Sequence, residues 1–102
     1  MAKAFLIDSE AQSIEQIEVT QVGEISALVG FDTIESDDVG NGADKLFFDE
    51  ECFIRGTAGR FQIDKLIPVA GKGVVVGVAG DGNTLVDASV VLDDLLARTR
   101  FV

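Results

Sequence analysis

A run of valines set between glycines is the feature that most constrains the fold of this chain. Within Ile67 to Gly80, IPVAGKGVVVGVAG, the valines at positions 74, 75, 76 and 78 form an apolar, β-branched segment. Consecutive apolar residues place apolar side chains on both faces of a strand, as in strands that are covered on each side. The segment therefore predicts a strand buried on both faces, around which the rest of the chain packs.

The residues before this run predict two β-hairpins. Lys3 to Asp8 and the segment SIEQIEV form the first one, and the two isoleucines of SIEQIEV lie three residues apart, a spacing that a β-bulge would explain. The second hairpin joins residues 31–35 (FDTIE) to residues 45–49 (KLFFD) through a polar connection with the turn dipeptide Asn41-Gly42. A further short strand is expected at residues 60–63.

Two helices are expected. Thr20 is a suitable N-cap for a helix through Val29 that ends at Gly30. Asp87 or Ser89 would cap a C-terminal helix, which packs on the sheet through its leucines at positions 92, 95 and 96. These elements predict one α+β domain over residues 1–102, with a mainly antiparallel sheet of about five or six strands and two helices.

Charge is distributed unevenly along the chain. The formal net charge is −10, and residues 1–51 contain 13 acidic and 2 basic residues, whereas residues 52–102 contain 5 acidic and 6 basic ones. An acidic first half disfavours nucleic acid and anionic membranes as partners and favours basic protein surfaces or cations. Solubility is the alternative explanation of the same acidity.

The scarcity of sulfur and imidazole limits the chemistry. A single cysteine, Cys52, excludes an intramolecular disulfide, and the absence of histidine removes most zinc and copper chemistry, so no metal or cofactor is expected. The apolar stretch in the first residues is too short for the core of a signal peptide or for a membrane span. A cytoplasmic protein is therefore expected.

Two segments resemble ligand-binding loops only in part. Gly71-Lys72-Gly73 invites a phosphate site, but a valine strand follows where a P-loop requires a helix. Asp81, Asn83 and Asp87 invite a cation site, but Leu85 stands at the third ligand position and the closing glutamate is missing. Turns and strand ends are the favoured interpretation of both.

Carboxylates gather in the second hairpin without forming a catalytic pattern. Asp49, Glu50 and Glu51 lie near Asp37 and Asp38 if that hairpin forms, but a catalytic pair needs one carboxyl in an apolar pocket. Cys52 has no histidine to activate it and is expected to be a small buried side chain. No catalytic residue is predicted.

The pair Phe47-Phe48 points to opposite faces of its strand. Either the helices cover both rings, or one ring contacts a partner or a second copy in a homodimer.

The order of segments AFLID, LVGFDTIE, KLFFDEECFIRG and IPVAGKGVVVGVAGDGNTLVD, followed by a terminal helix, resembles a family of small acidic proteins carried by phages and plasmids. The resemblance spans nearly the whole chain and rests on the order of segments and on the valine strand before a glycine-aspartate turn. It implies a cytoplasmic accessory protein of a mobile element that acts by binding, and it implies no catalytic residue.

The leading hypothesis is a non-enzymatic module that binds a basic protein surface through the side chains of Asp37, Asp38, Phe47, Phe48, Asp49, Glu50 and Glu51. One alternative is a DNA mimic, whose carboxylates would repeat at roughly the 7 Å phosphate spacing of a DNA strand to occupy a host enzyme. Another is a small enzyme or ligand-binding domain, which would need a deep pocket with convergent polar groups.

Overall fold

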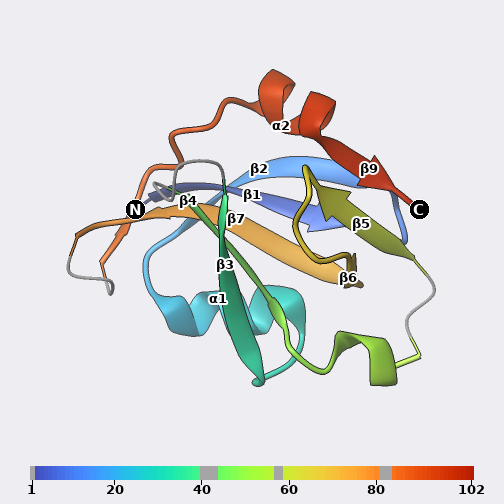
Figure 1. Cartoon of the computed structure of the whole chain (residues 1–102). Helices are drawn as coiled ribbons and strands as arrows, with labels where there is room; N and C mark the ends of the chain where they lie inside the picture. The colour runs from blue at the N-terminus through green and yellow to red at the C-terminus, as the bar shows by residue number, and fades with distance from the viewer. Residues whose placement is uncertain (1, 40–43, 57–58, 81–83) are drawn as a thin grey trace.

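The computed structural model describes residues 2–39, 44–56, 59–80 and 84–102. Its larger, six-stranded sheet is antiparallel throughout, and β7 (Lys72–Val78) lies at its centre. The order across the sheet is β2 (Ser13–Val19), β1 (Ala2–Asp8), β7, β4 (Asp44–Asp49) and β3 (Ile34–Val39), and β8 (Leu85–Val86) pairs with the end of β7. Figure 1 shows this arrangement.

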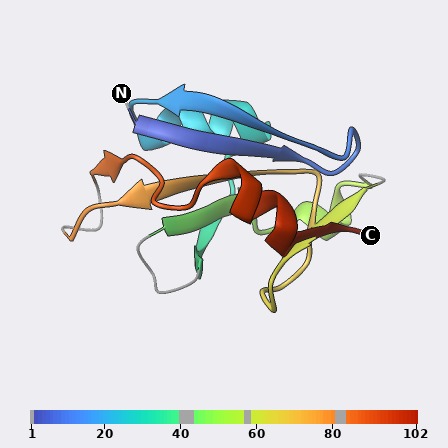
Figure 2. The same ribbon diagram turned by 90° about the horizontal axis from the view of Figure 1, so that it is seen from above.

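A smaller antiparallel sheet packs against the larger one. It consists of β6 (Val69–Ala70), β5 (Arg60–Ile63) and β9 (Thr99–Phe101), in that order. Helix α1 (Val22–Val29) covers one face of the large sheet, and α2 (Leu92–Arg98) lies with the small sheet on the opposite side (Figures 1 and 2). The short 3₁₀ helix η1 (Cys52–Ile54) connects β4 to the small sheet. The predicted α+β architecture is confirmed, and the second sheet is an addition to it.

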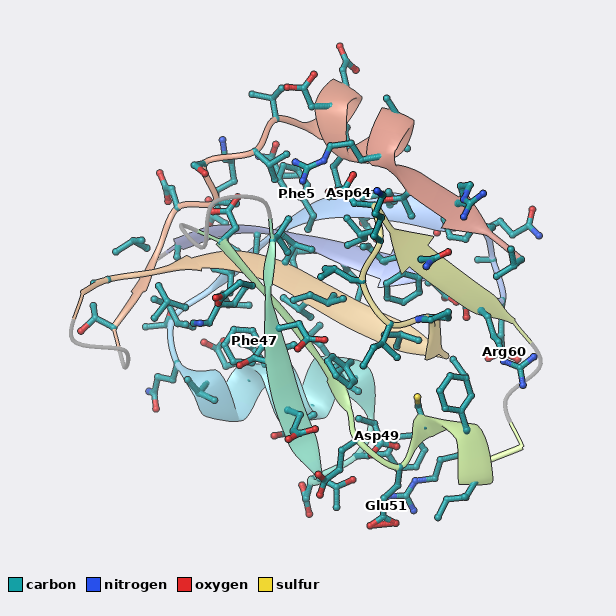
Figure 3. The ribbon with its side chains drawn as sticks, in the orientation of Figure 1. Phe5, Phe47, Asp49, Glu51, Arg60 and Asp64 are labelled. Carbon is teal, nitrogen blue, oxygen red and sulfur yellow. The ribbon has the colours of Figure 1, made fainter. Side chains whose placement is uncertain are left out.

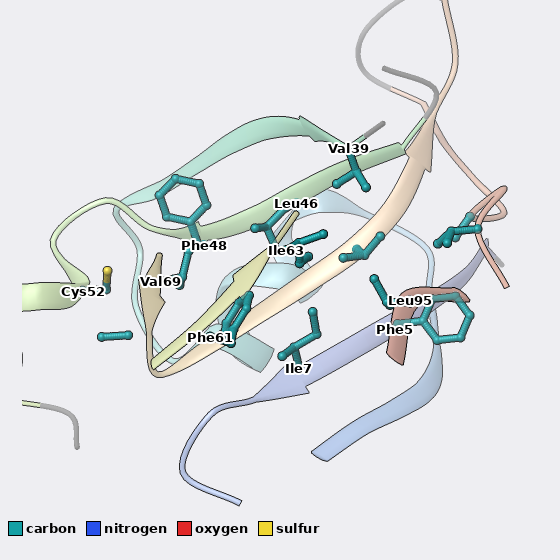
Figure 4. Packing of buried hydrophobic residues seen from close by; sticks show 14 residues of the cluster. Phe5, Ile7, Val39, Leu46, Phe48, Cys52, Phe61, Ile63, Val69 and Leu95 are labelled. Atoms are coloured by element: carbon teal, nitrogen blue, oxygen red, sulfur yellow. The ribbon is translucent and has the colours of Figure 1, made fainter. Parts of the chain in front are cut away.

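The valine run is buried on both faces, as predicted. Val74 and Val76 pack with Ile25 and Val29 of α1, and Val75 faces the opposite side. All three valines have no accessible surface. On the Val75 side, side chains from β1, β4, β5 and α2 converge on one cluster (Figure 4). The central strand therefore carries a separate apolar core on each face.

Gly73 permits the two sheets to approach one another. A Cβ atom at this position would lie 2.7 Å from Cζ of Phe61 and 3.0 Å from Cδ1 of Leu46. Phe61 belongs to β5 and is completely buried. The missing side chain at position 73 thus provides the space in which the small sheet places its aromatic ring.

The β1–β2 hairpin has a regular register, from Ala2 opposite Val19 to Asp8 opposite Ser13. The spacing of Ile14 and Ile17 therefore needs no bulge, because the two side chains lie on opposite faces. Ile14 packs on the cluster beneath α2, and Ile17 packs on the cluster beneath α1. A strand whose two faces are both partly covered does not need a strict period of two.

Helix α1 begins one residue later than predicted. Its N-cap is Gln21 rather than Thr20, and the carboxylate of Glu24 accepts hydrogen bonds from the backbone N–H groups of both residues. The side chain three positions into the helix thus satisfies the backbone donors of the two residues that precede the helix, whereas an N-cap side chain accepts from donors inside the first turn. Gly30 ends the helix as predicted, with φ of 95°.

Helix α2 differs from its prediction in its cap and its contact face. Its N-cap is Val91, whose side chain cannot accept a hydrogen bond, and neither Asp87 nor Ser89 caps it. Leu95 is fully buried and Leu92 is half-buried, but Leu96 remains 46% exposed. Successive helical residues differ by about 100° in direction, so the face that buries Leu95 turns Leu96 toward solvent.

Replacing Leu95 with Ala should lower the free energy of unfolding by about 2–5 kcal/mol, because a buried leucine leaves a cavity. Replacing Leu96 with Ala, one position along the same helix, should change it by less than about 0.5 kcal/mol. Chemical denaturation of both variants measures the difference. Equal effects would contradict the docking of α2 through Leu95.

Replacing Gly73 with Ala should destabilise the protein by about 1–3 kcal/mol, because the new methyl group must displace the ring of Phe61 or the strand itself. Gly80→Ala is the control, since a Cβ atom at Gly80 meets no atom within 4 Å. Thermal or chemical unfolding of the two variants gives the comparison, and a neutral Gly73→Ala would contradict the close approach of the sheets.

Candidate functional site

The predicted acidic residues lie on the β3–β4 hairpin but in two separate groups. Strand β3 covers residues 34–39 rather than the predicted 31–35, so Asp37 and Asp38 lie within the strand and not in the connection. Asp38 pairs with Lys45 in register, whereas Asp49 pairs with Ile34. Positions 45 and 49 are about 14 Å apart along a strand at about 3.4 Å per residue. The prediction that all these carboxylates meet at one end of the hairpin is therefore wrong.

The turn dipeptide Asn41-Gly42 lies outside the described residues, as do Asp81 and Asn83. The antiparallel pairing of β3 with β4 is itself as predicted.

Asp49 is a buried anchor rather than a surface charge. Its side chain is 2% exposed. One carboxylate oxygen accepts hydrogen bonds from the hydroxyl of Thr33 and from the backbone N–H of Glu51, the latter at 3.0 Å. The other oxygen accepts a hydrogen bond from Nε of Arg55 at 3.0 Å. Asp49 therefore fastens the entry of β3 and the start of η1 to the end of β4 (Figure 3).

Arg55 completes this Asp49 cluster, which consists of Phe31, Thr33, Asp49 and Arg55. Its guanidinium lies 4.2 Å from the centroid of the Phe31 ring and donates to the hydroxyl of Thr33 at 3.2 Å. A guanidinium stacked on an aromatic ring and paired with a carboxylate is held in one orientation. Its positive charge is thereby held against the buried carboxylate of Asp49, although Arg55 itself lies at the surface.

Opposing effects act on the pKa of Asp49. Burial raises the pKa of this carboxyl group, but hydrogen bonds from Thr33, Arg55 and the backbone of Glu51, together with the charge of Arg55, outweigh burial and leave the pKa below its ordinary value. The ionised form is thus the one that the folded protein stabilises.

The two phenylalanines are both covered by the chain's own side chains. Phe48 is 9% exposed and belongs to the cluster beneath α2, whereas Phe47 is half-buried and packs on the cluster beneath α1. Of the two interpretations of this pair, intramolecular cover is the one observed. Phe48 therefore belongs to the core, and Phe47 packs on a core while remaining partly exposed, so a contact of this ring with a partner stays a prediction.

The carboxylates that remain free on the hairpin are fewer than expected. Among the described residues, Lys45 pairs with Asp38 at 2.5 Å, and Glu51 lies 3.9 Å from Arg55. Asp32, Glu35 and Glu50 are exposed and Asp37 is half-buried, and none of the four has an ion pair within the described part of the chain. Glu35 was absent from the predicted set, although its place in an acidic strand could have indicated it.

A pocket of about 270 Å³ lies where α1, β4, η1 and the start of β7 meet. Its lining includes buried Cys52 and Asp49, together with Glu10 and Lys72 at exposed positions. This volume is near the lower end of small-molecule sites. The Asp49 carboxylate in its wall is already hydrogen-bonded, and no buried side-chain N or O atom of the described residues lacks a partner. The charged side chains that the pocket offers to a ligand are therefore those of Glu10 and Lys72.

The Gly71-Lys72-Gly73 segment forms a structural turn into β7. Gly71 has φ of 83°, and its carbonyl accepts hydrogen bonds from the backbone N–H and the hydroxyl of Ser9, at 3.0 Å and 2.6 Å. A carbonyl bonded in this way joins the end of β1 to the start of β7.

Asp44 is a structurally important residue that sequence reasoning missed. It is 3% exposed, and its carboxylate accepts hydrogen bonds from the backbone N–H groups of Ser89 and Val90, at 2.7 Å and 2.9 Å. It thereby holds the segment that leads into α2 against β4. Its partners lie 45 and 46 residues away in sequence, so no local pattern indicates the contact.

No group of His, Cys, Asp and Glu residues in the described ranges could hold a metal ion, and no described helix has the length and apolarity to cross a membrane. No protein-family model, curated protein or solved structure matches the chain. The relation to phage and plasmid proteins therefore stays a prediction.

Replacing Asp49 with Asn should lower the free energy of unfolding at neutral pH by about 1–3 kcal/mol, because a buried charge-assisted network is broken. Since the folded-state pKa of Asp49 lies below its unfolded value, its contribution is fully present above the unfolded pKa of about 3.9 and is lost as pH falls through the folded pKa. The variant should therefore lose less stability than the wild type between neutral and acid pH, which denaturation at several pH values measures.

Asp64→Asn is the matched control, because Asp64 also pairs with an arginine, Arg98, but is partly exposed. An exposed pair contributes only about 0–1 kcal/mol. An unchanged acid dependence in Asp49→Asn would show that another group governs the acid response.

Proposed function

We propose that this protein is a non-enzymatic binding module that places the acidic β3–β4 hairpin, residues 31–39 and 44–55, on a basic protein surface. In keeping with its resemblance to phage and plasmid proteins, we propose a cytoplasmic accessory role in a mobile element. One observation carries the proposal: both cations of the hairpin are already paired internally. Lys45 is held by Asp38, and Arg55 by Asp49 and Glu51, so neither cation neutralises Glu35, Asp37 or Glu50.

The charge of this region supports attraction over distance. Residues 31–55 contain eight acidic and two basic residues, a net charge of −6. Like charges held close together repel each other, typically by a few tenths of a kcal/mol for each neighbouring pair. A basic partner would relieve this repulsion. Association driven in this way is fast and weakens as salt shortens the Debye length.

DNA mimicry is supported less well by the same hairpin. Glu35 and Asp37 are two residues apart on one face of β3, which is about 7 Å and near the phosphate spacing. The next acidic residue, Asp38, lies on the opposite face and is paired with Lys45. A mimic needs a longer array to engage several basic residues together.

The test removes three of the free charges of the hairpin without touching the Asp49 cluster. A triple variant with Glu35→Gln, Asp37→Asn and Glu50→Gln should fold at least as stably as the wild type, because repulsion is relieved. It should bind about tenfold or more weakly to a basic protein captured from the native host and purified, since each exposed ion pair contributes up to about 1 kcal/mol. Titration calorimetry at low and high salt gives the affinities.

A second triple variant, with Glu15→Gln, Glu18→Gln and Asp93→Asn, is the control because it removes three exposed carboxylates elsewhere. If both variants bind alike, or if the wild type captures no basic protein, the hairpin is only a solvated face. Displacement of the captured protein by duplex DNA would instead favour mimicry.

A further inference from the structure

Strand β3 is an edge of the large sheet. It pairs with β4 from Ile34 opposite Asp49 to Val39 opposite Asp44, and no described strand lies on its other side. An edge strand presents unpaired backbone N–H and C=O groups, which are a template for a further strand. Its six residues have the length of an ordinary strand.

The hydrogen bonds identify the residues of β3 that face outward. The N–H of Glu50 donates to the C=O of Thr33 at 2.8 Å, so these two residues form a hydrogen-bonded pair just beyond the ladder. Such pairs alternate along antiparallel strands. Ile34, Ser36 and Asp38 therefore direct their N–H and C=O groups away from β4. Ile34 uses its N–H on the C=O of Asp32, which leaves the outward donors of Ser36 and Asp38 available among the described residues.

We propose that this edge binds an extended basic segment of another protein, which adds to the sheet as a strand beside β3. The inference rests on the proposed function and specifies its partner: a strand of alternating basic and apolar residues. Basic side chains at alternate positions would lie across from Glu35 and Asp37, which share one face of β3. Backbone hydrogen bonds to Ser36 and Asp38 would provide affinity, and the carboxylates of Glu35 and Asp37 would favour a partner strand with basic side chains.

Charge also argues against a second copy of this chain at the same edge. Pairing of β3 with another β3 would bring Glu35, Asp37 and Asp38 of the two copies together. Like charges across neighbouring strands are destabilising. The opposite edge, β2, carries Glu15 and Glu18 over seven residues, a lower density of carboxylates than β3 has.

The experiment uses a synthetic peptide of about seven residues, one strand in length, in which lysine and valine alternate. Ser36→Pro removes an outward donor and leaves the β3–β4 bonds in place, and proline is tolerated at such edge positions. Gln16→Pro is the matched control on β2. The C=O of Lys3 accepts a hydrogen bond from the N–H of Ala88, on the side of β1 away from β2, and the backbone groups of Phe5, two residues on, face the same side. Gln16 lies opposite Phe5, so its own backbone N–H and C=O groups point away from β1, toward the outside of the sheet.

We expect Ser36→Pro to weaken peptide binding by about tenfold, the value of one to two backbone hydrogen bonds, and Gln16→Pro to leave it unchanged. Fluorescence anisotropy measures both affinities. Unchanged binding by Ser36→Pro, or weakened binding by Gln16→Pro alone, would overturn the proposal.

Amide hydrogen exchange of the wild type provides a readout that does not depend on the folding of a variant. With saturating peptide, the amides of Ser36 and Asp38 should exchange more slowly, and unchanged exchange would overturn the proposal. If the hairpin charge variant loses binding but Ser36→Pro does not, the acidic surface binds its partner without strand addition. If neither variant loses binding, the proposed function fails as well.

Discussion

Burial of β7 on both faces is the constraint on which the rest of the structure depends. Val74 and Val76 need cover on one side and Val75 on the other, so a single layer of sheet cannot satisfy them. Helix α1 supplies the first cover. The small sheet and α2 supply the second, and they can approach because position 73 has no side chain where the ring of Phe61 packs. The strands beside β7 then leave β2 and β3 as the edges of the large sheet.

The carboxylates of the chain serve two different purposes, which burial separates. Asp44 and Asp49 are buried and accept several hydrogen bonds each, so they fasten other segments of the chain to β4. Glu35, Asp37 and Glu50 have no such role and stay at or near the surface. Arg55 forms an ion pair with Asp49, and Lys45 forms one with Asp38. The carboxylates of Glu35, Asp37 and Glu50 therefore determine the electrostatic potential around the hairpin. Buried acids thus stabilise the hairpin, and exposed acids carry its proposed recognition.

The sequence predicted best those elements that are determined by residues close to one another in the chain. The β1–β2 hairpin, the valine strand and the end of α1 at Gly30 all follow from neighbouring residues. The prediction was wrong where the cause lies elsewhere in the chain. Strand β3 begins at Ile34 because its register with β4 and the contact of Thr33 with Asp49 determine the start. Leu96 remains exposed because the core lies on the side of α2 that carries Leu92 and Leu95.

The sequence by itself determined the class of the fold, the central strand and the excess of negative charge in the first half. These depend on composition and short-range periodicity, which the order of residues expresses directly. Only the tertiary structure decided which carboxylates are buried, which cations neutralise them and which strand lies at the acidic edge. The physical reason is that packing brings together residues that are not neighbours in sequence. Asp44 contacts Ser89, and Phe61 packs where Gly73 has no side chain, and no local sequence pattern indicates either contact.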